Sequence, residues 1–97
     1  MYVNPTDSVN LNELFKLAAG LQARGKKVEV RSLHGGAQVI VYNDEGEGEW
    51  DAVCHSFSYG KDSGLLEIMG GPVEGPDEVE GYLTADEILA RIDREES

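Results

Sequence analysis

The chain has little cysteine, little positive charge and no long apolar run. Cys54 is its only cysteine, so no disulfide can form within the chain, and we expect a reducing, cytoplasmic location. No stretch approaches the ~18 consecutive apolar residues of a membrane helix. Residues 1–12 lack the basic start and apolar core of a signal peptide. We therefore expect neither a membrane-spanning nor an exported protein.

Positive charge is both scarce and unevenly placed. The chain has 8 Lys and Arg against 19 Asp and Glu, a net charge of -11. Residues 1–41 carry a net charge of +2, whereas residues 42–97 carry -13. A field of this sign repels nucleic acid and anionic membranes, and it attracts basic proteins or cations. We expect no nucleic-acid or membrane partner, and we expect a basic protein surface as the partner.

The remaining composition is that of a globular protein. Hydrophobic residues make up 40% of the chain and charged residues 28%, so the acidity is added to an ordinary core. A length of 97 residues suits one hydrophobic core. We expect residues 1–97 to form a single domain.

Two segments have the periodicity of helices. From Asn10, apolar residues recur every three or four positions, which predicts a helix over about residues 9–24. Ser8 or Asn10 is its predicted cap, and Gly25 its predicted C-terminal stop. Thr84 and Glu87 have the spacing of a capping box, which predicts the start of a second helix.

Four segments are predicted to form strands. Alternating apolar and polar residues indicate a strand over 27–33, and Gly35-Gly36 favours a tight turn into a second strand over 38–42. An acidic, glycine-containing connection over 43–49 leads to a third strand over 49–57. Residues 65–69 are apolar enough for a fourth, and 70–76 contain two prolines typical of a connector.

This order predicts a two-layer α+β domain with the sequence α-β-β-β-β-α. Short connections between consecutive strands favour a four-stranded antiparallel meander, with both helices packed on one face of the sheet. The predicted core joins strand residues to helix residues. The strand residues are Val28, Val30, Val39, Val41, Trp50 or Val53, and Ile68, and the helix residues are Leu14, Phe15, Leu21, Leu89 and Ile92.

Cys54 and His55 are the main candidates for catalysis, because an imidazolium near a thiol lowers the thiol pKa. Neighbours on a strand point to opposite faces, which favours a buried structural cysteine instead. The sequence has no recognised cofactor, phosphate-loop or transition-metal motif, so we assign no catalytic or metal residue and expect no cofactor. A small enzyme or ligand-binding protein that uses Cys54 and His55 remains an alternative.

Two acidic clusters are the candidate partner-binding residues. The first contains Asp44, Glu45, Glu47, Glu49 and Asp51, and the second contains Glu74, Asp77, Glu78 and Glu80. Three aromatic residues are further candidates for contacts with a partner: Trp50, Tyr59 and Tyr82. Carboxylates separated by glycines can also bind Ca²⁺, although the spacing is not that of an EF-hand. A calcium-dependent adaptor is therefore a further alternative.

The segments KVEVRSLHGGAQVIVY, WDAVCHSFSYG, GLLEIMGG and EVEGYLTADEILARI resemble small proteins encoded by phages and prophages of Gram-positive bacteria. The resemblance implies a cytoplasmic accessory role during infection or lysogeny, and it brings no established activity or functional residue. With the charge, it favours a non-enzymatic, acidic protein–protein interaction module. One version is a decoy that mimics nucleic acid and occupies a basic, nucleic-acid-binding surface. A homodimer, formed through a sheet edge or the helix-free face, is compatible with it.

Overall fold

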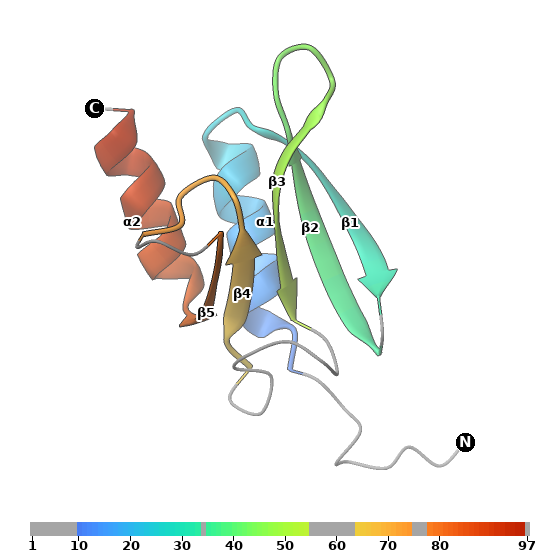
Figure 1. Ribbon diagram of the computed structural model, residues 1–97. Coiled ribbons are helices and arrows are strands. Elements are labelled where there is room, and N and C mark those ends of the chain that lie inside the picture. Colours follow the sequence, from blue (N-terminus) through green and yellow to red (C-terminus); the bar gives the residue numbers. More distant parts are fainter. Residues whose placement is uncertain (1–9, 34, 55–63, 75–77, 97) are drawn as a thin grey trace.

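The computed structural model describes residues 10–33, 35–54, 64–74 and 78–96, which form two helices beside one antiparallel sheet (Figure 1). The sheet has five strands in the order β1-β2-β3-β4-β5, so each strand pairs with its neighbours in the chain. In chain order the elements are α1 (Asn12–Ala23), β1 (Lys27–Leu33), β2 (Gly36–Tyr42), β3 (Gly48–Cys54), β4 (Leu66–Met69), β5 (Val79–Leu83) and α2 (Ala85–Glu95). The predicted α+β class and its helix–strands–helix order are confirmed.

The predicted number of strands is wrong, because the structure contains a fifth strand, β5. It pairs with β4 through Leu66 and Leu83 at one end and Met69 and Val79 at the other. The pairing shifts register between these ends, and Tyr82 has a φ of 60°. This irregularity removes the clean alternation by which a strand is recognised in a sequence.

Helix α1 is shorter at its N-terminus than predicted and ends as predicted. The Asn10 side chain accepts a hydrogen bond from the Asn12 N–H, whereas Ser8 lies outside the described residues. At the other end Gly25 has a φ of 78°, and its N–H donates to the Gln22 carbonyl. The Lys26 N–H donates to the Leu21 carbonyl, which completes a Schellman motif.

Helix α2 begins at the predicted capping box and packs against α1. The Thr84 hydroxyl accepts from the Glu87 N–H, and the Glu87 carboxylate accepts from the Thr84 N–H. Glu13 of α1 also accepts a hydrogen bond from the Ala85 N–H, at 2.7 Å. The missing side chain of Gly20 lets Leu89 approach α1 closely, because a Cβ at Gly20 would lie 2.5 Å from a Leu89 methyl carbon. These contacts hold the two helices side by side.

One hydrophobic core lies between the helices and one face of the sheet. Its buried members include Leu14, Leu17, Val39, Ile68 and Ile88. Trp50 and Val53, predicted as alternatives, are both buried, and Trp50 belongs to this core. Neither of the two described helices lies over the opposite face of the sheet, which we call the helix-free face (Figure 1).

The prediction that Phe15 and Val30 belong to the core is wrong. Phe15 is 53% exposed and Val30 is 43% exposed. Val30 pairs with the buried Val39 and shares its face of the sheet, but it lies on the edge strand β1. Phe15 is not among the buried residues of α1, and it lies to one side of the stripe that they form. The periodicity of the sequence places both residues on the face that points toward the core. It does not indicate where along that face the packing of helices against strands ends.

Candidate functional site

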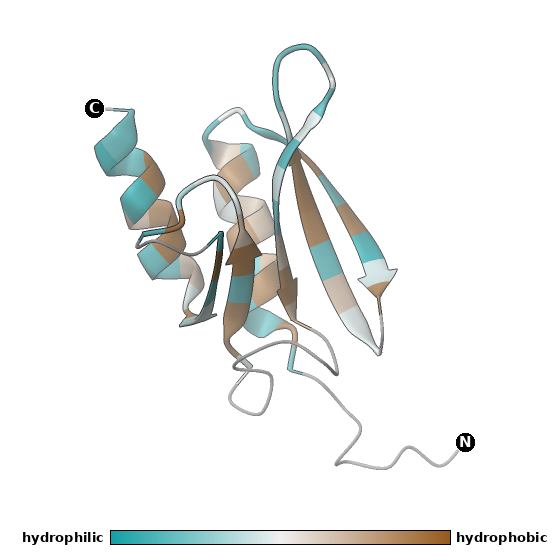
Figure 2. Cartoon of the chain, in the orientation of Figure 1, coloured by the Kyte–Doolittle hydropathy of each residue, from teal (hydrophilic) through white to brown (hydrophobic). Residues whose placement is uncertain are grey.

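The first acidic cluster lies on the loop between β2 and β3 and on the start of β3. Asn43 organises the loop, because its side-chain oxygen accepts from the N–H groups of Glu45 and Glu47, at 2.9 and 3.0 Å. Gly46, with a φ of 83°, completes the turn. The loop is largely hydrophilic and lies beyond one end of β2 and β3 (Figure 2). Four carboxylates of this cluster are exposed: Asp44, Glu45, Glu47 and Glu49.

A groove of about 470 Å³ lies beside this loop, where β2, β3 and β4 meet. Ile40 and Met69 contribute apolar surface to it, and Met69 is 53% exposed. Both residues pair with Asp51, so all three share the helix-free face of the sheet. The groove is bordered by three carboxylates, and its lining contains no Lys or Arg among the residues that the structure describes. Those carboxylates are Glu49, Asp51 and Glu78.

The sequence identified the acidic residues of this groove and missed its apolar ones. Ile40 belongs to the continuous apolar run 39–42, in which successive residues alternate between the two faces of β2. Such a run signals apolar residues on both faces of a strand. That signal was available for Ile40, whereas the exposure of Met69 depends on the pairing of β3 with β4.

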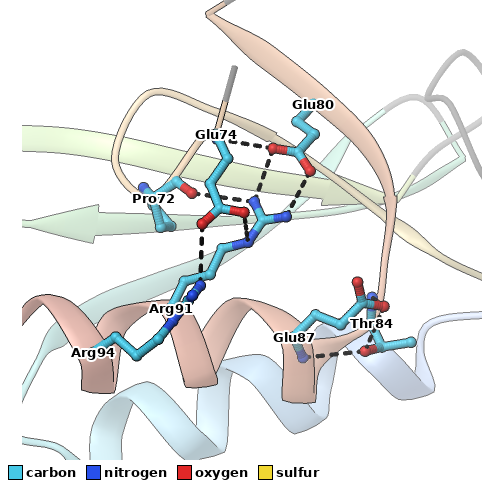
Figure 3. A network of polar contacts seen from close by, with 7 residues as sticks. All are labelled: Pro72, Glu74, Glu80, Thr84, Glu87, Arg91 and Arg94. Carbon is cyan, nitrogen blue, oxygen red and sulfur yellow. Dashed lines mark hydrogen bonds and ion pairs between the residues drawn. The ribbon is translucent and has the colours of Figure 1, made fainter.

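Two members of the second acidic cluster, Glu74 and Glu80, contact arginines of α2 (Figure 3). Arg91 of α2 donates two hydrogen bonds to the Glu80 carboxylate, at 2.8 and 2.7 Å, and one to the Pro72 carbonyl, at 3.2 Å. Glu74 forms ion pairs with Arg91 and Arg94, at 3.3 and 3.1 Å. Glu80 and Glu74 therefore tie β5 and the β4–β5 connection to α2. Glu78 is exposed at the groove, and Asp77 lies outside the described residues.

The Glu80 pKa reflects this contact. The hydrogen bonds from Arg91, and then the one from the Glu74 N–H, lower the pKa of Glu80. The same carboxylate raises the pKa of Arg91. Both groups are therefore charged at neutral pH, and their charges compensate each other within the chain.

Ion pairs also compensate acids on the helix side of the molecule. Lys16 pairs with Asp86 and Arg24 with Asp93, at 2.9 and 2.8 Å, and Lys26 pairs with Glu96. None of the ion pairs formed between described residues involves the three groove carboxylates. Among the described residues, the loop and groove carboxylates therefore belong to the negative charge that no ion pair compensates.

A second hollow, of about 390 Å³, lies where the C-terminal ends of both helices approach the β2–β3 loop. Its lining has mixed charge. The cations are Arg24, Lys26 and Lys27, and the acids are Asp44, Glu49, Glu95 and Glu96, so Glu49 borders both this hollow and the groove. The ion pairs of Arg24 and Lys26 with α2 engage two of these cations. This hollow therefore lacks the single sign of charge that characterises the groove.

Cys54 has the surroundings of a structural cysteine. Its side chain is fully buried in the core, and its thiol lies 3.4 Å from the Asn10 carbonyl, to which it donates a hydrogen bond. Burial raises the pKa of the Cys54 thiol, which is the opposite of what a nucleophile needs. His55 lies outside the described residues. The contacts of Cys54 give the enzymatic alternative no support.

We expect the Cys54 thiol to react slowly with a disulfide reagent at neutral pH. Because access requires opening of the core, labelling of the native protein should be at least ~100-fold slower than in denaturant. The measurement is the rate of thiol labelling with and without denaturant. If the native protein is labelled as fast as the unfolded chain, the thiol of Cys54 is accessible and reactive, which would contradict its assignment as a buried structural cysteine.

The described residues contain no group of three or more His, Cys, Asp or Glu side chains arranged to hold a metal ion. This result covers the loop carboxylates, so the geometry gives the calcium-adaptor alternative no support. Within the same residues, neither helix has the length and apolar content needed to cross a membrane.

The three candidate aromatic residues have different positions. Trp50 is buried in the core and contributes to the groove lining. Tyr82 is 65% exposed on β5 and is not among the residues that line the groove. Tyr59 lies outside the described residues. Met69, which the sequence did not single out, is the exposed apolar residue of the groove.

Comparison with protein-family models, with curated proteins and with solved structures finds no match for this chain. The assignment of a function therefore depends on the geometry and charge described above.

Proposed function

We propose that the protein is a non-enzymatic interaction module that binds a basic segment of a partner protein in the groove on the helix-free face of the sheet. The observation that carries this proposal is an apolar groove bordered by Glu49, Asp51 and Glu78. Its apolar surface provides a contact for an aliphatic side chain, and its carboxylates attract flanking Lys or Arg side chains. The loop carboxylates extend the same negative field beyond the groove.

The distribution of ion pairs supports this choice of surface over the rest of the acidic chain. Carboxylates such as Asp86, Asp93 and Glu80 already have a cation of the same chain beside them. A partner that bound there would have to displace an existing contact. Glu49 and Glu78 are exposed and form no ion pair with another described residue, so a basic partner displaces no such contact there.

The finer version of the proposal is a decoy, in which the bound basic surface is one that otherwise binds nucleic acid. The carboxylates of the loop and groove would then replace phosphates as the negative groups. This version predicts competition: a DNA or RNA fragment should displace the protein from its partner. A partner that binds the protein and nucleic acid at the same time contradicts the decoy version and leaves the interaction module intact.

The binding test uses a fluorescent peptide in which a leucine is flanked by arginines, at low salt. We expect the wild-type chain to bind it, and we expect E49Q/E78Q to bind about tenfold more weakly, because two unscreened charge contacts are lost. E95Q/E96Q is the matched control, since it changes the net charge equally on α2. Fluorescence anisotropy measures both affinities.

An equal loss of affinity in the two double variants would show that peptide binding depends on the net charge of the protein and not on the groove. Absence of binding by the wild-type chain at low salt would contradict the proposal itself. A loss confined to E49Q/E78Q, reduced further by raising the ionic strength, is the expected result.

A further inference from the structure

Among the residues that the structure describes, strand β1 forms one edge of the sheet along seven residues. Within these residues it pairs only with β2, because the sheet order places it at the end. Its pairing with β2 has no bulge, and it contains no proline. The other edge strand, β5, has five residues with a register shift and a residue at positive φ, features that protect an edge. Of the two edges, β1 is the one suited to accept another strand.

Apolar surface accompanies this open edge. Val30 is 43% exposed on the helix-covered face of β1, and Phe15 is 53% exposed on α1. The α1 residues that contact α2, such as Glu13, Lys16 and Arg24, lie on a different flank from Phe15. Phe15 is therefore turned away from α2, and α1 has its other flank toward β1. A second strand beside β1 would cover Val30 on the face of the sheet that α1 packs against.

We propose that this occupant is β1 of a second copy, paired antiparallel about Val30 to form a homodimer with a continuous sheet. We call the boundary between the two β1 strands the seam. A two-fold axis perpendicular to the sheet passes through it, and residues opposite each other in an antiparallel pair point to the same face. The residue at the axis must therefore lie opposite its own copy. Three central registers are available, with Glu29, Val30 or Arg31 opposite its own copy. Only these three keep most of the strand paired.

Charge selects one of the three registers. On the helix-free face β1 carries Lys27, Glu29 and Arg31. A register centred on Glu29 places the two Glu29 side chains opposite each other and Lys27 opposite Arg31, so like charges face each other. A register centred on Arg31 places the two Arg31 side chains opposite each other. Arg31 already pairs with Glu29 of its own strand. Centring on Val30 also places Glu29 of one copy opposite Arg31 of the other in both symmetry-related positions, so positive and negative side chains alternate and no existing contact has to be displaced. It also pairs all seven residues and places the two Val30 side chains together on the helix-covered face.

The local charge of the chain also favours this edge. Each copy has a net charge of -11, so association is least opposed where negative charge is lowest. Residues 1–41, which include β1 and α1, carry +2. The groove on the helix-free face lies at β2, β3 and β4, so the dimer leaves it open. The inference is independent of the proposed peptide binding, and either can fail alone.

Sedimentation equilibrium over a range of concentrations tests the dimer. The wild-type mass should rise from 10.6 kDa toward twice that value. R31E should weaken the dimer by at least about tenfold, because both Glu29–Arg31 contacts become repulsive. The charge swap E29R/R31E should restore it. Circular dichroism of each variant verifies the fold, and a wild-type chain that is monomeric at millimolar concentration would overturn the proposal.

A disulfide tests the register. Under oxidation V30C should form a cross-linked dimer, because residue 30 faces its own copy. S32C lies on the same face of β1 and keeps the Glu29–Arg31 contacts, so it is the matched control; it should not cross-link, since four residue rises separate its two positions along the seam. Native Cys54 is buried and should not compete. Cross-linking of S32C in preference to V30C, or a charge swap as weak as R31E alone, would contradict the register centred on Val30.

Discussion

Gly71→Ala is expected to lower the free energy of unfolding by about 3 kcal/mol. Gly71 has a φ of 58°, a left-handed conformation that costs an alanine about 1 kcal/mol. Its Cβ would also lie 2.4 Å from Cγ of Trp50, a buried core residue whose ring cannot move freely. Overpacking of this kind costs roughly 1–3 kcal/mol more. Urea denaturation of the variant and the wild-type chain measures the difference.

Gly46→Ala is the matched control for this prediction. Gly46 also has a positive φ, of 83°, but nothing lies within 4 Å of the position of its Cβ. This substitution should therefore cost only the backbone contribution of about 1 kcal/mol. Equal losses at the two positions would mean that Gly71 is not packed against Trp50 as described.

Arg91→Met should destabilise the domain by about 2 kcal/mol, the second large effect. The Arg91 side chain is only 12% exposed, and its guanidinium holds the Glu80 carboxylate with two hydrogen bonds (Figure 3). Methionine preserves the packing of the stem and leaves Glu80 and the Pro72 carbonyl without this donor. Thermal and urea unfolding measure the loss.

Two variants separate the buried contact from surface charge. Arg94→Met removes an arginine that is 67% exposed, so it should change stability by less than about 0.5 kcal/mol. Adding Glu80→Gln to Arg91→Met should recover part of the loss, because the unpaired carboxylate is then neutral. A double variant no more stable than Arg91→Met would show that the loss comes from packing alone.

The same contact predicts a dependence on pH. Because Arg91 lowers the pKa of Glu80 in the folded state below its ordinary 4.5, the contact stabilises the fold fully above that pH. The stabilisation is lost as the pH falls through the lowered, folded-state pKa. The difference in stability between the wild-type chain and Arg91→Met should therefore shrink in acid. A difference that grows in acid would contradict the assigned pairing.

Elements with strong local signals were predicted from the sequence with little error. Strand β1 has the predicted bounds because Lys27–Leu33 alternates and is flanked by glycines. The capping box of α2 depends on residues three positions apart, so it is also visible locally. Strand β5 was missed because its pairing shifts register and its alternation is broken. Its position is determined by β4 and by the Arg91–Glu80 contact, both distant in sequence.

For the candidate site, the sequence identified which residues are acidic and did not indicate which of them are compensated. Glu80 and Arg91 are eleven positions apart, and they meet only because α2 packs beside β5. The exposure of Met69 likewise follows from β3–β4 pairing. Charge composition therefore leads only to the expectation of a basic partner, which stays a prediction, while the surface that we propose for it required the arrangement of the strands.

The most direct test of the proposed binding surface is an NMR titration of the ¹⁵N-labelled chain with the leucine–arginine peptide. We expect chemical-shift changes to concentrate at the groove, at Ile40, Asp51, Met69 and Glu78, with smaller changes in the β2–β3 loop. The amides of α2 should stay unchanged. Changes centred on the α2 carboxylates, or spread evenly over all acidic residues, would contradict a defined binding groove.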